Sequence, residues 1–116
     1  MRVLIIDDNA AARFLLREML ETHGLEVVAE AEDLNSALTA YRTHKPHRVT
    51  LDLSLEHGDG IEILKALRQL DPKAEVFIIS ANAQNKIKQV ALSAGASGFL
   101  TKPVQAEELI ALFARA

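Results

Sequence analysis

The chain has 116 residues, of which 49% are hydrophobic and 25% are charged, and its formal net charge is -3. This length and composition predict one globular domain over residues 1–116 with a single packed core, and they exclude a disordered chain. The absence of long apolar runs, of cysteine and of a basic cluster argues against a membrane span, against disulfides or thiolate metal sites, and against direct nucleic-acid binding.

Short apolar segments alternate with segments of helical periodicity along the whole chain. Strand character is found in residues 3–6, 27–29, 49–51, 76–79 and 98–101. Helical spacing is found in residues 10–22, 34–43, 60–70 and 106–115. A further helix is expected to begin at Asn82 or a neighbouring residue and to end at residue 94. Because the first strand begins almost at the N-terminus, we expect no signal peptide, and the absence of cysteine suits a cytoplasmic protein.

Several details of these elements follow from local chemistry. Glutamates flank the second strand, at Glu26 and Glu30, which is typical of a strand at the edge of a sheet. Asp33 and Asp59 are the expected N-caps of the second and third helices. The residues expected on inner helix faces include Ala12, Leu15, Leu16 and Met19 in the first helix and Ile87, Val90, Ala91 and Ala94 in the fourth.

Five repeats of strand then helix predict an α/β fold with parallel strands and right-handed crossovers, so that helices cover both faces of the sheet. Two arrangements fit, an open doubly wound sheet and a fragment of an eight-fold barrel, and five units in one short chain favour the open sheet. With strand order 2-1-3-4-5, the first and third strands are neighbours. Ligands of such sheets bind at the carboxyl ends of the strands.

Polar residues follow four of the five apolar strands at that edge. They are Asp7 and Asp8 after the first strand, Asp52 after the third, Ser80 after the fourth and Lys102 after the fifth. Three carboxylates in one crevice repel one another, and a bound Mg²⁺ with oxygen ligands would relieve this repulsion. Such a site suits phosphoryl transfer to Asp52, with the cation and Lys102 neutralising the phosphoryl oxygens. Asp8 is the best second carboxylate ligand, and Asp7 could bind through water.

Each of these residues alone has a simpler explanation. Asp-Asp-Asn before a helix is a capping cluster, and a single Asp or Ser after a strand is more often a turn residue. It is their joint placement at one sheet edge that favours a functional site. The four histidines show no metal-binding pattern and are expected to be solvated loop residues, with His57 worth attention because it neighbours the proposed site.

The sequence closely resembles the receiver domain of two-component response regulators, and is similar to the chemotaxis-type single-domain regulators. The matching segments are residues 3–8, Leu51-Asp52-Leu53, Asp59-Gly60-Ile61-Glu62, Ile78-Ile79-Ser80-Ala81 and 95–103. The resemblance implies a flavodoxin-like (βα)5 fold. It also implies that Asp52 is the phospho-acceptor, charged by a histidine kinase or a histidine phosphotransfer protein.

The same resemblance implies further roles. Mg²⁺ would be held by Asp8, Asp52 and the backbone carbonyl of Ser54, with Asp7 assisting through water. Lys102 and Ser80 would contact the phosphoryl group, and a cis peptide would join Lys102 to Pro103. Phe99 occupies the position of the switch aromatic, which moves inward when Ser80 engages the phosphoryl group.

Phosphorylation would then alter the face formed by the fourth helix, the fifth strand and the fifth helix, and a phosphorylation-linked homodimer through that face is a hypothesis. Glu56-His57-Gly58 departs from the family pattern, which has proline at the position of Glu56. Phe14, beside the acidic pair, is a hypothetical contact for the phosphodonor.

Two other functions remain open. An unphosphorylated receiver-like interaction module would keep the fold without the chemistry. A small phosphohydrolase of the haloacid-dehalogenase type also uses an aspartyl nucleophile, but its Asp-x-Asp signature follows the first strand, where this chain has adjacent Asp7-Asp8. By its resemblance to response regulator receivers, in contrast, the chain would catalyse only its own phosphorylation and dephosphorylation and would not be an enzyme in the usual sense. The sequence leaves the kinase, the output and any attached domain undetermined.

Overall fold

The computed structural model describes residues 1–53, 60–82 and 84–115. The elements follow the order β1 (Arg2–Ile6), α1 (Ala10–Thr22), β2 (Glu26–Ala31), α2 (Leu34–His44), β3 (Arg48–Asp52), α3 (Gly60–Leu70), β4 (Val76–Ser80), α4 (Asn85–Ser93), β5 (Gly98–Thr101) and α5 (Ala106–Arg115). None of the helices in these ranges is both long and apolar enough to cross a membrane.

The five strands form one parallel sheet in the order β2-β1-β3-β4-β5, which confirms the predicted open sheet and excludes the barrel fragment. β2 lies at one edge, as predicted from Glu26 and Glu30, which fall within the strand rather than beside it. The register pairs Ile6 with Leu51, Asp52 with Ile79, and Ser80 with Thr101. The carboxyl ends of the four strands β1, β3, β4 and β5 therefore lie side by side, and the residues that follow them meet at one edge.

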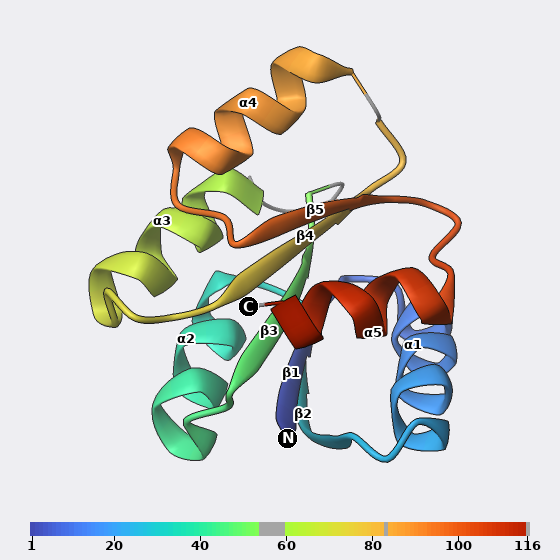
Figure 1. The fold of residues 1–116 in the computed structure, drawn as a ribbon. Coiled ribbons are helices and arrows are strands. Elements are labelled where there is room, and N and C mark those ends of the chain that lie inside the picture. The colour runs from blue at the N-terminus through green and yellow to red at the C-terminus, as the bar shows by residue number, and fades with distance from the viewer. Residues whose placement is uncertain (54–59, 83, 116) are drawn as a thin grey trace.

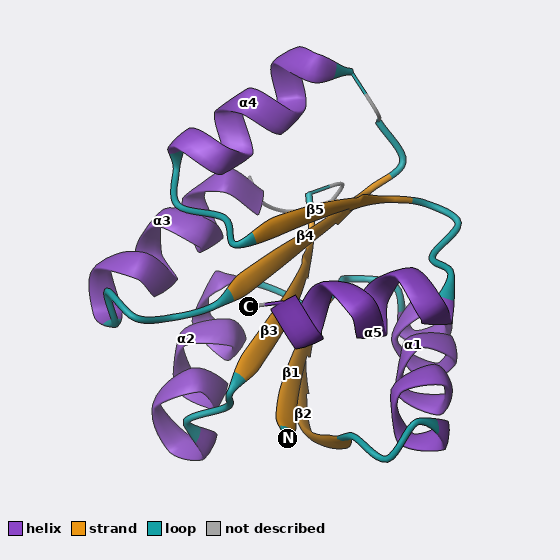
Figure 2. Ribbon diagram, viewed as in Figure 1, coloured by secondary structure: helices purple, strands orange, loops and turns teal. Residues whose placement is uncertain are grey.

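Helices cover both faces of the sheet, α1 and α5 on one face and α2, α3 and α4 on the other (Figures 1 and 2). This arrangement explains why all five residues of β4 are buried. The core under α1 and α5 contains Val3, Ile5, Leu20, Val27, Phe77, Leu109 and Phe113. The larger core under the other helices includes Leu4, Leu51, Leu64, Leu67 and Ile78.

The inner face of α1 differs from the prediction. Leu15 is 66% exposed, whereas Leu20 is completely buried. Ala12, Leu16 and Leu20, spaced four residues apart, form the row nearest the sheet, and Leu15 lies on the flank of the helix. Because apolar residues cover two neighbouring rows of α1, periodicity alone could not decide which row is buried.

The start of α4 also differs from the prediction. The helix begins at Asn85, with Gln84 as N-cap, and Asn82 instead accepts a hydrogen bond at its side-chain Oδ1 from the Gln84 amide at 2.9 Å. A short polar side chain that bonds the backbone two residues ahead competes with helix formation. Val90, expected to face inward, is 45% exposed.

The cap of α2 is confirmed. Asp33 accepts a hydrogen bond from the Ser36 amide, and the Ser36 hydroxyl accepts one from the Asp33 amide, which forms a capping box. The predicted cap of α3, Asp59, lies outside the described residues.

Candidate functional site

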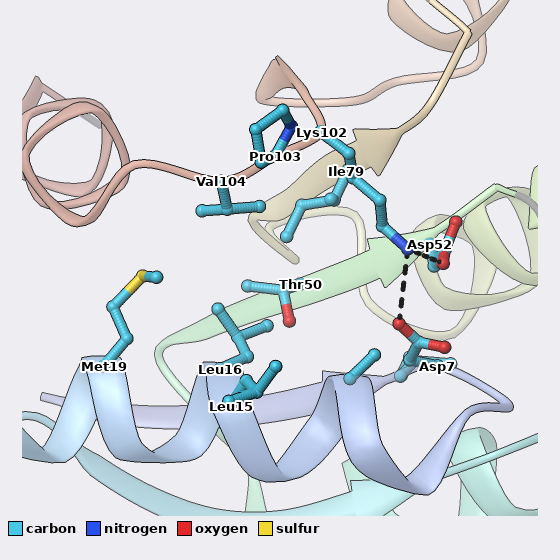
Figure 3. A pocket seen from close by; sticks show the side chains of 12 residues that line it. Asp7, Leu15, Leu16, Met19, Thr50, Asp52, Ile79, Lys102, Pro103 and Val104 are labelled. Carbon is cyan, nitrogen blue, oxygen red and sulfur yellow. Dashed lines mark hydrogen bonds and ion pairs between the residues drawn. The ribbon is translucent and has the colours of Figure 1, made fainter.

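An ion pair between β3 and the end of β5 is the centre of the candidate site. Asp52 is the last residue of β3 and is only 4% exposed. The Lys102 Nζ lies 2.6 Å from the Asp52 Oδ2 and 3.8 Å from the Asp7 Oδ2 (Figure 3). The predicted convergence of these three residues from three different strands is therefore present.

Asp7 serves both the turn and the site. Its Oδ1 accepts a hydrogen bond from the Asn9 amide at 2.9 Å, while its Oδ2 faces Lys102. Asn9 in turn caps α1 by accepting a bond from the Ala12 amide at 2.9 Å, and Arg13 donates to the Asp7 carbonyl at 2.6 Å. One carboxylate oxygen of Asp7 therefore stabilises the turn, and the other is directed toward Lys102.

The electrostatics of the site show an excess of negative charge. Burial raises the pKa of Asp7, and the nearby Asp52 carboxylate raises it further, against the lowering effects of the Asn9 amide and Lys102. Burial alone would lower the pKa of Lys102, but its hydrogen bond to Asp52 and the charges of Asp52, Asp7 and Asp8 outweigh burial and raise it. The carboxylates thus favour a cation between them.

Ser80 and Lys102 are held next to each other by the sheet. The Lys102 amide donates to the Ser80 carbonyl at 2.9 Å, and the Lys102–Pro103 peptide bond is cis, as the resemblance implied. Ser80 is 2% exposed, and its Oγ accepts a bond from the Asn82 amide at 3.1 Å. The hydroxyl proton of Ser80 can still be donated to an incoming anion.

Phe99 lies on β5 and is half-buried, so it is neither fully in the core nor fully in solvent. The ammonium group of Lys88, from α4, lies 5.7 Å from the centroid of its ring, a distance at which a cation is attracted to the ring face. The aromatic side chain therefore links β5 to α4 in this structure.

The residues of the site fit a divalent cation in their chemistry. Within the described part of the chain, no group of three or more His, Asp or Glu side chains is arranged to hold a metal ion. Carboxylate oxygens of Asp8 and Asp52 are nevertheless the hard ligands that Mg²⁺ prefers. The excess of negative charge around Lys102 would also favour the binding of a further cation. Ser54, the remaining expected ligand, lies outside the described residues, as do Glu56-His57-Gly58.

One buried polar residue beside the site was not predicted. Thr50, two residues before Asp52, has a buried hydroxyl between β3 and α1. Its one signal in the sequence is a hydroxyl side chain inside the apolar segment Val49-Thr50-Leu51, and because β-branched threonine is common in strands, this signal does not by itself indicate a site.

Comparison with known proteins agrees with this geometry. The family model described as the response regulator receiver domain matches residues 3–114. The chain is 39% identical to the chemotaxis protein CheY of Bacillus subtilis over 94% of this chain and 91% of that protein. Among solved structures, Borrelia burgdorferi CheY, in a complex with CheX, BeF3 and Mg²⁺, has a TM-score of 0.91 at 28% identity, over 97% of this chain and 85% of that chain.

Another solved relative carries a phosphorylated aspartic acid. A response regulator from Burkholderia pseudomallei, with a phosphorylated aspartic acid, a calcium ion and citrate, has a TM-score of 0.88 at 28% identity, over 97% of this chain and 65% of that chain. The fold is the flavodoxin-like fold of CheY. The protein belongs to the response regulator receiver domain family.

Proposed function

We propose that this receiver domain accepts a phosphoryl group on Asp52 from a phosphohistidine donor, either a histidine kinase or a histidine phosphotransfer protein, in the presence of Mg²⁺. The observation that carries the proposal is the placement of the Lys102 ammonium 2.6 Å from the Asp52 carboxylate, at the sheet edge where Asp7 also lies. Receiver domains act as signalling switches rather than as enzymes with separate substrates.

The chemistry of each residue supports a distinct role in the transfer. An Asp52 oxygen attacks the phosphorus, the P–N bond to the donor histidine breaks, and the imidazole departs with a proton. Lys102 compensates charge on the phosphoryl oxygens, and the Ser80 hydroxyl donates a hydrogen bond to one of them. Mg²⁺, when bound by Asp8, Asp52 and the Ser54 carbonyl, with Asp7 acting through water, would supply the remaining positive charge.

In the proposed switch, Ser80 and Phe99 couple the phosphorylation site to the α4–β5–α5 face. Movement of Ser80 toward the phosphoryl group would leave space for Phe99, and inward movement of the ring would break its contact with Lys88. Partner binding on the α4–β5–α5 face would change as a result, through a target protein or a second copy of the chain. Light scattering with and without a phosphoryl mimic tests the homodimer, and an unchanged mass would exclude it.

Intact mass spectrometry tests the phospho-acceptor. The protein is incubated with acetyl phosphate or phosphoramidate and Mg²⁺, and one phosphate adduct is expected, which should be absent in Asp52→Asn. Asp33→Asn is the matched control, because asparagine retains the capping function at that exposed position and the adduct should persist.

Other outcomes would support the competing functions. An adduct that persists in Asp52→Asn would refute the assignment of the acceptor. The absence of an adduct with any small donor or kinase would support an interaction module, and rapid turnover of a phosphoester would support a hydrolase.

A further inference from the structure

A cavity of about 550 Å³ adjoins the acidic end of the site, between α1, β3 and the segment 102–104 (Figure 3). Its walls are mostly aliphatic side chains, among them Leu15, Leu16, Met19, Ile79 and Val104. A volume of several hundred cubic ångströms with apolar walls and a few polar groups is typical of a small-molecule site.

The charged end of this cavity favours a cationic ligand. Asp7, Asp52 and Lys102 line it, and Asp8 is close enough for its charge to raise the pKa of Lys102. Three carboxylates against one ammonium leave a formal charge of about -2. Opposite charge in a partly enclosed site is attracted, whereas an anionic ligand would face repulsion from all three carboxylates.

Thr50 supplies an independent observation that points to a ligand in the cavity. The residue is 1% exposed, and within the described residues its Oγ1 has no hydrogen-bond partner. Figure 3 shows the hydroxyl directed from β3 toward α1, into the space lined by Leu16 and Val104. Buried hydroxyl groups are normally hydrogen-bonded, so a polar atom of a bound molecule would satisfy this one.

The spacing of the polar groups restricts the ligand further. Thr50 and Asp52 are two residues apart on one strand, so their side chains lie on the same face with Cα atoms about 6–7 Å apart. A molecule that contacts both needs an ammonium group at one end and a hydrogen-bonding group about that far along an apolar body.

We propose that the cavity between α1 and β3 is a binding site for a small organic ammonium ion of the phenolic amine class. The ammonium group displaces that of Lys102 from between the carboxylates of Asp7 and Asp52, the ring packs against Leu16 and Val104, and the hydroxyl group bonds to Thr50. This site goes beyond the proposed phosphoryl transfer and does not require it. Because the head group occupies the acidic end, bound amine and bound Mg²⁺ exclude one another.

Calorimetric titration without Mg²⁺ or a phosphodonor tests the site, so the result is independent of whether Asp52 is phosphorylated. The probes are tyramine, phenethylamine, which lacks the hydroxyl group, and 3-(4-hydroxyphenyl)propionate, which has an anionic head. Tyramine should bind about 5-fold more tightly than phenethylamine, the gain expected of one hydrogen bond. The propionate should bind at least about 10-fold more weakly than tyramine, because its charge is reversed.

The Thr50→Val variant preserves the shape of the side chain and removes its hydroxyl group. In this variant tyramine and phenethylamine should bind equally. If the wild-type preference for tyramine persists in Thr50→Val, the hydroxyl contact is wrong, and if the propionate binds as well as tyramine, the cationic ligand class is wrong.

A pair of surface variants locates the binding. Leu15 and Phe14 are 66% and 59% exposed neighbours on α1, and Leu15 lines the cavity whereas Phe14 does not. Leu15→Lys should weaken tyramine binding about 5-fold by removing an apolar wall and adding a like charge, and Phe14→Lys should change it less than about 2-fold. Equal effects of the two variants would place the binding elsewhere and overturn the proposal. Amide NMR spectra of each variant verify that the fold is intact.

Discussion

Replacing Lys102 by methionine should destabilise the protein when divalent cations are absent and should tighten Mg²⁺ binding. The Lys102 Nζ is 2.6 Å from the Asp52 Oδ2. Coulomb's law gives this pair an attraction of about 1.6 kcal/mol in bulk water and about 6 kcal/mol at an effective dielectric constant of about 20. The lysine side chain is 34% exposed, so solvent screening and the desolvation of both charges offset most of the larger value. We expect the free energy of unfolding to fall by about 2 kcal/mol.

Urea denaturation in EDTA and in saturating Mg²⁺ measures this effect. Far-UV circular dichroism is the appropriate signal, because the chain has no tryptophan and one tyrosine. In Mg²⁺ the bound cation replaces the lost ammonium charge, so the difference between wild type and Lys102→Met should shrink below about 1 kcal/mol. Lys65→Met, at an exposed position on α3, is the control and should change stability by less than about 0.5 kcal/mol in either condition.

An equal loss of stability in EDTA and in Mg²⁺ would refute the reasoning. It would mean that the aliphatic part of Lys102, rather than its charge between two carboxylates, stabilises the fold. An unchanged Mg²⁺ affinity would lead to the same conclusion, because the ammonium group would then not compete with the metal.

Three other substitutions test individual contacts of the fold and of the site. Gly60→Ala would place a Cβ 2.8 Å from the Leu53 Cα, a backbone atom that cannot turn aside, and should destabilise the protein by about 1–3 kcal/mol in urea denaturation. Tyr41→Phe removes the 2.8 Å hydrogen bond to Asp71 and should cost about 1 kcal/mol at pH 7; the cost should shrink as pH falls through the lowered pKa of Asp71, because the acceptor is then protonated. Asp7→Asn should stabilise the protein at pH 7, because the raised pKa means that the charged form is disfavoured in the fold. That gain should disappear as pH falls through the folded-state pKa toward 3.8, where wild-type Asp7 is protonated too; thermal denaturation across this range would contradict the reasoning if the gain were constant.

The fold was predictable because local signals agreed with the tertiary structure. Val76–Ser80 is buried throughout, and a strand covered by helices on both faces is expected to be apolar, which its sequence shows at every position before the terminal Ser80. The convergence of the candidate site residues was predictable for a related reason. Asp52, Ser80 and Lys102 each end or follow a strand, and the topology of a parallel sheet brings such positions together.

The features that were wrong or missed depend on packing between distant segments. The choice between Leu15 and Leu20 as core residues of α1 is decided by how the helix is rotated against the sheet, because both belong to apolar rows. The unsatisfied hydroxyl of Thr50 is a property of the space between β3 and α1, and no local pattern in the sequence reports it.

The remaining difference from the prediction is the weak packing of α4, which bears on the proposed phosphorylation switch. Ala91 is the one fully buried residue of α4, all of which is described, whereas α3 buries Ile63, Leu64 and Leu67. Displacing α4 therefore exposes little apolar area and costs less free energy than displacing α3.

The ammonium group of Lys88, on α4, contacts the ring of Phe99, on β5. Lys102 directly follows the same strand. In the proposed switch, a movement of the Phe99 ring would remove its contact with Lys88 and weaken the attachment of α4. An energetic difference of one or two kcal/mol, the size of one cation–π contact or one hydrogen bond, is enough to change the population of such a helix about 5- to 30-fold. The same poor packing that made α4 hard to predict from periodicity thus makes it the helix that the proposed phosphorylation of Asp52 would move at the lowest cost in free energy.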